Sequence, residues 1–453
     1  MDDLIEEVDF EDDHQCPNLI SALKAILLQY FTTLLWLTIS VPCLPFFVLG
    51  LFIWGLPPII PPWSTFYRCF MAVFTEGKPK ENIPVTNRVL LFLILLASLI
   101  KVPVNGVCWY IDELVCSSYH KVNIEEPVFM ITAPRSGSSQ LCDYLEKDSN
   151  NFITPVLAEG MFPYVWVWKL FVPLLVKTGM QKKLQNYNLF GKEATKHHAL
   201  VISKSETWDS ILQFWYLGIC YTYLGSSFMC WAWLYTRFDR PMNEDYFRNF
   251  VPFTSCVMKK VMYYRGKPNQ RMLVKGHFLG CAKPLEQHYP KGKIFVVVRN
   301  PLDRLSSFIN LAKVMGEDGP AKLQFGLFAA TLRTIRSYTL QTQIPYCEQE
   351  MLFYKEPADN KLVIPFTMYV NNLSATLQHI YSFCDIPIPD DVMSNAVRIQ
   401  CTTHDYTKVK ASYAPKFNRT LASLGVNEKK LREKLSEYIE WMNGLESSEK
   451  IDS

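Results

Sequence analysis

The sequence predicts an α/β domain, a parallel sheet flanked by helices, preceded by membrane-associated helices at the N-terminus. Two short apolar runs, Val128–Ala133 and Lys293–Val298, are each followed by a turn and then by a helix-like pattern. The letters IFVVV within the second run show no polar alternation, which is typical of a strand covered on both faces of a parallel sheet. A long apolar stretch near the N-terminus indicates membrane contact.

Composition limits the classes of function. The chain has 453 residues, and its 29 Phe, 23 Tyr and 11 Trp side chains suit membrane contact or a large apolar pocket. A formal net charge of +3 without a Lys/Arg run argues against a nucleic-acid partner. The 13 cysteines show neither CxxC pairs nor His spacing, so we expect no zinc or other metal site and no redox motif.

The N-terminal quarter divides into a tail and a membrane-associated region. Residues 1–18 carry eight acidic residues and no Lys or Arg, which predicts a disordered acidic tail and excludes a signal peptide. Residues 19–112 are predicted to be membrane-associated, with two apolar segments. The first, Leu19–Trp63, either spans a bilayer once or turns back at Pro42–Pro45. The second runs from Val89 to Ile100 and continues past Lys101 towards Ile111, and it either spans or lies at the interface.

The remaining chain is predicted to be a catalytic domain over residues 121–442 and a polar tail over residues 443–453, with an amphipathic helix at Asn427–Met442. If the second apolar segment spans, the basic loop before it stays cytoplasmic and the catalytic domain faces the lumen of the endoplasmic reticulum or Golgi. Sequons at Asn372 and Asn418 would permit glycosylation there. A cytoplasm-facing domain is the alternative.

The loop after the first strand, Pro134–Ser139, has the sequence P-R-S-G-S-S and leads into a helix. Such a junction directs unpaired backbone N–H groups and the positive end of a helix dipole at one point, and Arg135 adds a charge. We expect it to hold an anionic group of phosphate type, although an ordinary connection is the alternative for this loop alone. The Walker A spacing and its Lys are missing, which disfavours a kinase or ATPase.

A second loop of the same kind follows the second strand. Its sequence is R-N-P-L-D-R-L-S-S-F, from Arg299 to Phe308. The alternative for this loop alone is a capping and surface pair of Arg299 and Asp303. Two anion-binding loops in one sheet suit a ligand with two separated phosphates.

The two loops together, P-R-S-G-S-S and V-V-R-N-P-x-D-R-x-x-S-F, resemble the sulfotransferase superfamily, in particular its membrane-bound and bacterial branches. The resemblance implies a fold related to P-loop NTPases and the donor 3′-phosphoadenosine-5′-phosphosulfate (PAPS). It implies that the 5′-phosphosulfate is held by Arg135, Ser136, Gly137, Ser138 and Ser139. It implies that the 3′-phosphate is held by Arg299 and Ser307, and by Lys416 and Arg419 from a loop that closes over the nucleotide.

Further stretches resemble the same family and suggest catalytic residues. Ala158–Pro163 is similar to its W-E-x-x-F-P segment, which makes Glu159 the expected general base, in an apolar neighbourhood that favours this role. Leu273–Phe278 is similar to L-K-S-P-x-H and contributes Lys275 and His277. Arg135 and Lys275 would stabilise the charge that develops during transfer. Glu206 is a weaker candidate, for which a solvated place at a helix start is expected.

The sequence therefore predicts a membrane-anchored sulfotransferase that uses PAPS and no metal, and that acts on a hydroxyl or amine of a small-molecule, lipid or glycan acceptor. The aromatic-rich stretch Trp208–Phe238 suits a flat or lipidic acceptor, or else builds core helices. The alternatives are a P-loop-like phosphotransferase and a non-catalytic membrane scaffold with a degenerate nucleotide site.

Overall fold

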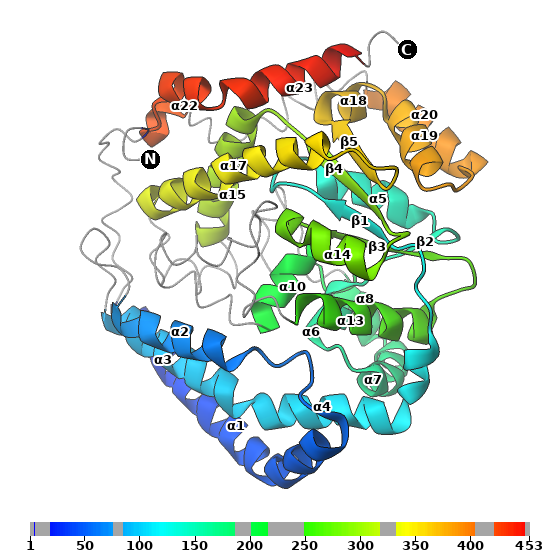
Figure 1. The fold of residues 1–453 in the computed structure, drawn as a ribbon. Helices are drawn as coiled ribbons and strands as arrows, with labels where there is room; N and C mark the ends of the chain where they lie inside the picture. Colours follow the sequence, from blue (N-terminus) through cyan, green and yellow to red (C-terminus); the bar gives the residue numbers. More distant parts are fainter. Residues whose placement is uncertain are drawn as a thin grey trace.

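A parallel sheet of five strands lies at the centre of the described chain (Figure 1), as the sequence predicts, with the strand order β2-β3-β1-β4-β5. The computed structural model describes residue 4 and residues 19–75, 85–185, 201–215, 249–317, 332–403 and 421–448. The strands are β1 (Val128–Ile131), β2 (Phe152–Ile153), β3 (Arg271–Gly276), β4 (Lys293–Val298) and β5 (Lys361–Pro365).

Helices precede the sheet and cover both of its faces. The N-terminal helices are α1 (Leu19–Trp54), α2 (Trp63–Thr75), α3 (Val85–Ile100) and α4 (Val102–Val115). The first half of the sheet domain adds η3 (Ser117–Lys121), α5 (Ser138–Lys147), α6 (Leu157–Met161), α7 (Val165–Lys177), α8 (Met180–Gln185), α10 (Trp208–Trp215) and α13 (Phe250–Arg265). The second half adds η6 (Leu279–Cys281), α14 (Ala282–His288), α15 (Pro301–Glu317), α17 (Leu332–Lys355), α18 (Phe366–Asn371), α19 (Leu373–Phe383), α20 (Asp390–Thr403), η7 (Ala422–Leu424), α22 (Glu428–Lys434) and α23 (Ser436–Ser448).

Strand β1 carries the first loop and lies in the middle of the sheet. Its Val128 is in register with Leu273 of β3 on one side and with Lys293 of β4 on the other. Because both pairings are parallel, the loops after β1 and β4 leave from the same edge of the sheet, next to each other. The chain moves to opposite sides of β1 in its two halves, and ligands of open α/β sheets bind at such a switch point.

Both faces of the sheet are buried, which explains the unbroken apolar pattern of β1 and β4. Val128 and Met130 pack with residues of α5 and α19 on one face. Phe129 and Ile131 belong to a second cluster, on the other face, with residues of α13, α14 and α17. Alternate residues of one strand thus enter different cores, as the period of two requires.

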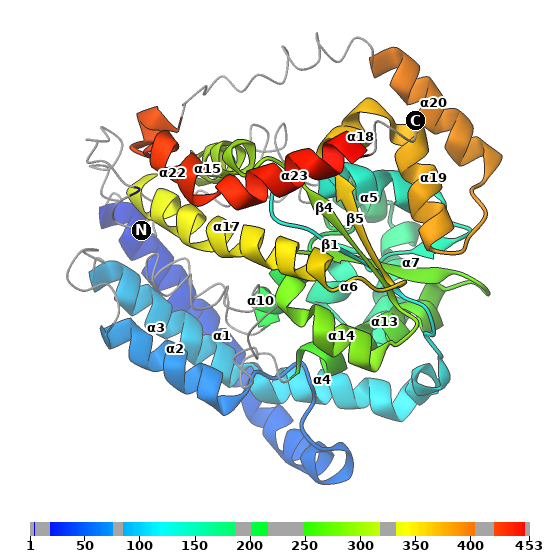
Figure 2. The same ribbon diagram turned by 45° about the horizontal axis from the view of Figure 1, so that its top comes forward.

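Helix α1 runs without a break through Pro42 and Pro45, so the described chain does not turn back there. It packs along α3 and α4, and these helices gather on one side of the molecule (Figures 1 and 2). Two segments, Ala22–Trp54 with mean hydropathy 2.1 and Arg88–Val115 with mean hydropathy 2.2, could cross a membrane by length and composition. The second segment extends past Lys101, as the sequence predicts, and reaches Val115.

The two ends of the chain differ from expectation. Leu4, within the predicted disordered tail, is buried, and its carbonyl accepts a hydrogen bond from the Asn427 backbone N–H at 3.0 Å. The predicted helix at 427–442 is two helices, α22 and α23, that meet at Leu435, and α23 continues to Ser448 beyond the predicted tail boundary. Burial of Leu435 and Met442 against the sheet domain holds this segment in place.

Candidate active site

The loop between β1 and α5 requires a glycine at position 137. Gly137 has a φ of 89° and precedes the first residue of α5, Ser138. A Cβ atom at this position would lie 2.7 Å from Cε2 of Phe366, so both the backbone conformation and the space exclude a side chain. The loop can therefore approach a ligand closely at the N-terminus of α5, as phosphate-binding loops do.

The two predicted anion-binding loops meet. Arg135 Nε donates to Ser307 Oγ at 2.9 Å, and Arg299 Nη1 donates to the Arg135 carbonyl at 2.9 Å. The Arg299 guanidinium lies over the ring of Phe366, 4.3 Å from its centroid. Residues that are far apart in the sequence thus form one site at the carboxyl ends of β1 and β4.

This site is positively charged and holds buried donors that lack partners. Burial and the nearby Arg299 charge lower the pKa of Arg135 to about 10. Burial also lowers the pKa of Arg299, although Asp303 opposes this effect. Within the part of the chain that the structure describes, the Ser136 hydroxyl and Arg299 Nε are buried without a hydrogen-bond partner. Buried polar groups normally have partners, so this arrangement fits a site that an anion completes.

Lys275, at the end of β3, brings a third cation to the same loop. Its Nζ donates to Ser139 Oγ at 3.4 Å, and its side chain is buried. Burial alone lowers the pKa of Lys275, but Cys142 and nearby acidic residues that include Glu206 outweigh it, so the pKa lies above the ordinary value. Lys275 is therefore charged at neutral pH and faces the loop from the other side of β1.

His277 is half-buried between the sheet and α10. Its Nδ1 donates to the Thr132 carbonyl at 2.5 Å, and its backbone N–H donates to Asp209 Oδ1 at 2.8 Å. Burial lowers the pKa of His277 despite the Asp209 carboxyl, so the imidazole is neutral at neutral pH. Because a carbonyl only accepts, the proton lies on Nδ1. His277 therefore supports Thr132, where the first loop begins.

Glu159 lies on α6 with both carboxylate oxygens engaged. Oε1 accepts from Arg265 Nε at 2.7 Å, while Oε2 accepts from Arg265 Nη2 at 2.9 Å and from the Val156 backbone N–H at 2.9 Å. The expected apolar neighbourhood is thus replaced by an ion pair, and Phe162 is exposed. Glu159 can act as a base only if Arg265 releases one oxygen.

Glu206 is buried, contrary to the expected solvated position. It precedes α10 and accepts a hydrogen bond from the Thr207 backbone N–H at 2.8 Å. An antiparallel bridge between Val156 and Ser205 places this segment beside α6, and the Glu206 charge acts on both Lys275 and His277. Two carboxylates, Glu159 and Glu206, therefore lie on neighbouring segments near the first loop.

Arg304 in the second loop motif has a structural role that the sequence did not reveal. Its Nη1 donates to both oxygens of Glu350 at 2.8 Å, and its Nη2 donates to Cys347 Sγ at 2.8 Å. Tyr438 donates its hydroxyl to Glu350 Oε2 at 2.5 Å. This buried network joins α15, α17 and α23. The acidic partner lies 46 residues away, so no local pattern identifies it.

Some candidates cannot be placed. Lys416 and Arg419, and the aromatic stretch from residue 216 to 238, lie outside the described residues. The described start of that stretch is core: Trp208 is buried and donates to Thr254 Oγ1 at 2.8 Å. Within the described ranges, no group of three or more His, Cys, Asp or Glu side chains is placed to hold a metal ion.

Comparison with known proteins identifies related sequences and folds. A profile described as "Sulfotransferase family" matches residues 127–390, more than half of the chain. The fold is similar to that of sulfotransferase STF9 from Mycobacterium avium, with a TM-score of 0.58, 11% identity, and coverage of 87% of this chain and 95% of that chain. Sulfotransferase STF1 from Mycobacterium tuberculosis gives a TM-score of 0.55, 12% identity, and coverage of 86% and 97%. No curated protein sequence gives a significant match.

Proposed function

This chain belongs to the sulfotransferase family, and on that premise we propose that it transfers a sulfuryl group from PAPS to a hydroxyl or amine of an acceptor at a membrane. One observation carries the proposal: Arg135, Arg299 and Ser307 meet beside the buried hydroxyl of Ser136, which has no hydrogen-bond partner among the described residues. A concentrated positive charge with unsatisfied donors suits an anionic nucleotide better than an ordinary loop connection.

The residues present fit PAPS. The proposed 5′-phosphosulfate site consists of Arg135, Ser136, Gly137, Ser138 and Ser139. The proposed 3′-phosphate site consists of Arg299 and Ser307, with Lys416 and Arg419 as further candidates. The absence of room for a side chain at Gly137 supports close approach of the backbone to the nucleotide.

The chain's own residues would then assist transfer. PAPS supplies the sulfuryl group. Arg135 and Lys275 place fixed positive charge at the loop, and each preorganised donor of this kind typically contributes about 3 kcal/mol of transition-state stabilisation. Glu159 is the proposed base for the acceptor proton, and the neutral imidazole of His277 is the second candidate. Proton transfer to Glu159 requires one of its oxygens to leave Arg265.

Membrane anchoring is the second part of the proposal. The two candidate spans at Ala22–Trp54 and Arg88–Val115 support it by length and composition. A bilayer-bound lipid or glycan acceptor, and a luminal domain in the endoplasmic reticulum or Golgi, are the accompanying proposals. Of the two sequons, Asn372 caps α19 by accepting from the Ala375 backbone N–H at 3.1 Å, and Asn418 lies outside the described residues.

The proposal is tested with detergent-solubilised full-length protein and with membranes that contain it. Adenosine 3′,5′-bisphosphate should bind more tightly than ATP in calorimetry, because the proposed site has one position for a 5′-phosphate and another for a 3′-phosphate. Membranes incubated with radiolabelled PAPS should transfer label to a lipid, glycan or small-molecule fraction. ATP binding that equals or exceeds that of the bisphosphate would favour a phosphotransferase, and PAPS binding without any transfer would favour a scaffold.

A further inference from the structure

Between Lys169 and Lys177, every exposed side chain of helix α7 is apolar. Leu170, Phe171 and Leu174 are 59%, 46% and 51% exposed. Its opposite side is buried through Val165 and Trp168, which pack into the main core. A surface helix of a water-soluble domain carries polar residues outward, and a helix that is apolar all round is usually buried or in contact with lipid. The outer face of α7 thus lacks the composition expected for contact with water.

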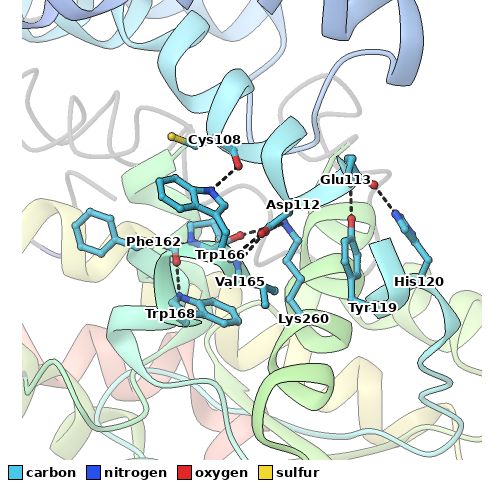
Figure 3. A network of polar contacts seen from close by, with 11 residues as sticks. Cys108, Asp112, Glu113, Tyr119, His120, Phe162, Val165, Trp166, Trp168 and Lys260 are labelled. Atoms are coloured by element: carbon cyan, nitrogen blue, oxygen red, sulfur yellow. Dashed lines mark hydrogen bonds and ion pairs between the residues drawn. The ribbon is translucent and has the colours of Figure 1, made fainter. Parts of the chain in front are cut away.

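The start of α7 adjoins the candidate membrane helices. Asp112 on α4 accepts hydrogen bonds from the backbone N–H groups of Val165 at 2.8 Å and Trp166 at 2.9 Å, at the start of α7. Trp166 Nε1 also donates to the Cys108 carbonyl of α4 at 3.0 Å. Figure 3 shows these contacts, with Asp112 directed at both α7 and Lys260. Helix α4 is the last part of the candidate span Arg88–Val115, so α7 is fixed at its end.

Basic residues flank the apolar face. Lys177 is the last residue of α7, and Lys182 and Lys183 lie on α8. All three lysines are exposed, and so is Met180 at the start of α8, with an exposed fraction of 50%. Apolar side chains with lysines at their border are the composition of helices that lie in the headgroup region of anionic bilayers. A protein partner would explain the apolar area but not its attachment to a candidate span.

We propose that α7 and α8 lie in the interface of an anionic lipid bilayer, so that the catalytic domain itself touches the membrane. The proposal rests on the proposed membrane association of α1–α4 and extends it to a helix within the matched family region. Phe162, which is 55% exposed, precedes α7 and immediately follows α6, the helix of Glu159. Bilayer contact at α7 therefore brings the acceptor side of the site to the lipid surface, which favours a membrane-dissolved acceptor.

The test uses full-length protein reconstituted into vesicles of phosphatidylcholine and phosphatidylserine. An environment-sensitive fluorescent amino acid replaces Leu174 in one sample and Val397, 46% exposed on α20, in a matched control. Helix α20 lies on the opposite side of the molecule from α1–α4 in both views (Figures 1 and 2). A third label replaces Phe52 of α1, which is 85% exposed and reports on the proposed anchor. Quenching by acyl-chain nitroxide lipids and by aqueous iodide is measured for each.

We expect lipid nitroxides to quench the labels at 174 and 52 several-fold more than the label at 397, with the opposite order for iodide. Lys182→Glu with Lys183→Glu should reduce lipid quenching at 174 in phosphatidylserine vesicles but leave it at 52 unchanged. Lipid quenching at 52 but not at 174 would overturn the α7 proposal and leave the anchor intact. Absence of lipid quenching at both would overturn both. Iodide shielding at 174 without lipid quenching would indicate a protein partner and likewise overturn it.

Discussion

At the scale of single residues, the first loop holds two left-handed backbone positions close together. Arg135 has a φ of 71° and Gly137 a φ of 89°. A left-handed conformation costs a non-glycine residue about 1–2 kcal/mol, so other contacts must hold Arg135 in place. The bond from Arg299 to its carbonyl and the bond from its Nε to Ser307 do so. The strain is located where the proposed anion binds.

Replacing Gly137 by Ala should weaken nucleotide binding. The added Cβ would lie 2.7 Å from the Phe366 ring, and the alanine would have to adopt a disfavoured positive φ, at a cost of about 1–3 kcal/mol. We expect the dissociation constant for adenosine 3′,5′-bisphosphate to rise about tenfold or more in calorimetry. Gly444→Ala is the matched control, since no described residue lies within 4 Å of its added Cβ. Equal affinity of the Gly137 variant and the wild type would contradict the assignment of this loop.

Replacing Glu159 by Gln tests the proposed base. The substitution removes the base that would take the proton from the sulfuryl acceptor. We therefore expect single-turnover sulfuryl transfer to slow by about 10²–10⁴-fold, while the affinity for the nucleotide is kept. Glu428→Gln is the control, because Glu428 also pairs with an arginine, Arg432, but on exposed α22. A nearly normal rate for Glu159→Gln would exclude Glu159 and shift attention to His277 and Glu206.

At the scale of elements, one carboxylate joins three helices. Asp112 of α4 forms a fully buried ion pair with Lys260 of α13 at 2.9 Å and also caps α7. The Lys260 ammonium lies 3.4 Å from the ring centroid of Trp109 and donates to the Pro163 carbonyl at 3.1 Å. Burial lowers the pKa of Lys260, and Asp112 opposes this shift. The junction between the N-terminal helices and the sheet domain thus depends on a paired buried charge.

Asp112→Asn should destabilise the protein markedly. It leaves Lys260 buried without its counter-charge, which typically costs about 3–5 kcal/mol. Denaturant unfolding in detergent should show this loss, and Asp112→Asn combined with Lys260→Met should recover part of it. Glu437→Gln is the control, since its pair with Lys355 is exposed and should contribute less than about 1 kcal/mol. Equal losses of stability in the Asp112 and Glu437 variants would show that the buried pair does not stabilise the junction between the N-terminal helices and the sheet domain.

At the scale of the whole molecule, histidines that are partly desolvated make stability depend on pH. Burial lowers the pKa of His277, His288 and His379 below the ordinary value, in three different parts of the fold. In the unfolded chain these histidines accept protons at about pH 6.5, which is a higher pH than in the folded state. The unfolded state therefore binds more protons as the pH falls, and stability decreases below that pH.

The melting temperature in detergent should accordingly fall as the pH is lowered from about 7.5 to 5.5. Because Asn does not titrate, His277→Asn should make the melting temperature depend less steeply on pH. At low pH the variant should avoid a loss of stability of about 1.4 kcal/mol for each unit by which folding lowers the pKa of His277. An identical slope in the wild type and the His277 variant would contradict a lowered pKa of this imidazole.

The sequence by itself determined the two central strands, both loops and the fold class. These features are local: an unbroken apolar run predicts a strand buried on both faces, and glycine and serine after it predict a phosphate-type turn. Strands β2, β3 and β5 were not predicted, because β2 has two residues and β3 carries Arg271 and Lys275. Pro42 and Pro45 suggested a turn, but the helix tolerates them.

Only the tertiary structure decided which side chains meet. Arg135 reaches Ser307 because β1 lies beside β4, and Lys275 reaches Ser139 because β3 lies on the other side of β1. Glu159 was predicted from a local motif, but its partner Arg265 is 106 residues away. Strand order and helix packing set these contacts, and both depend on the burial of apolar faces. The apolar pattern along the sequence is compatible with many strand orders, so it does not identify the contacts. A pattern along the chain therefore names the residue types of the site, and folding alone selects their partners.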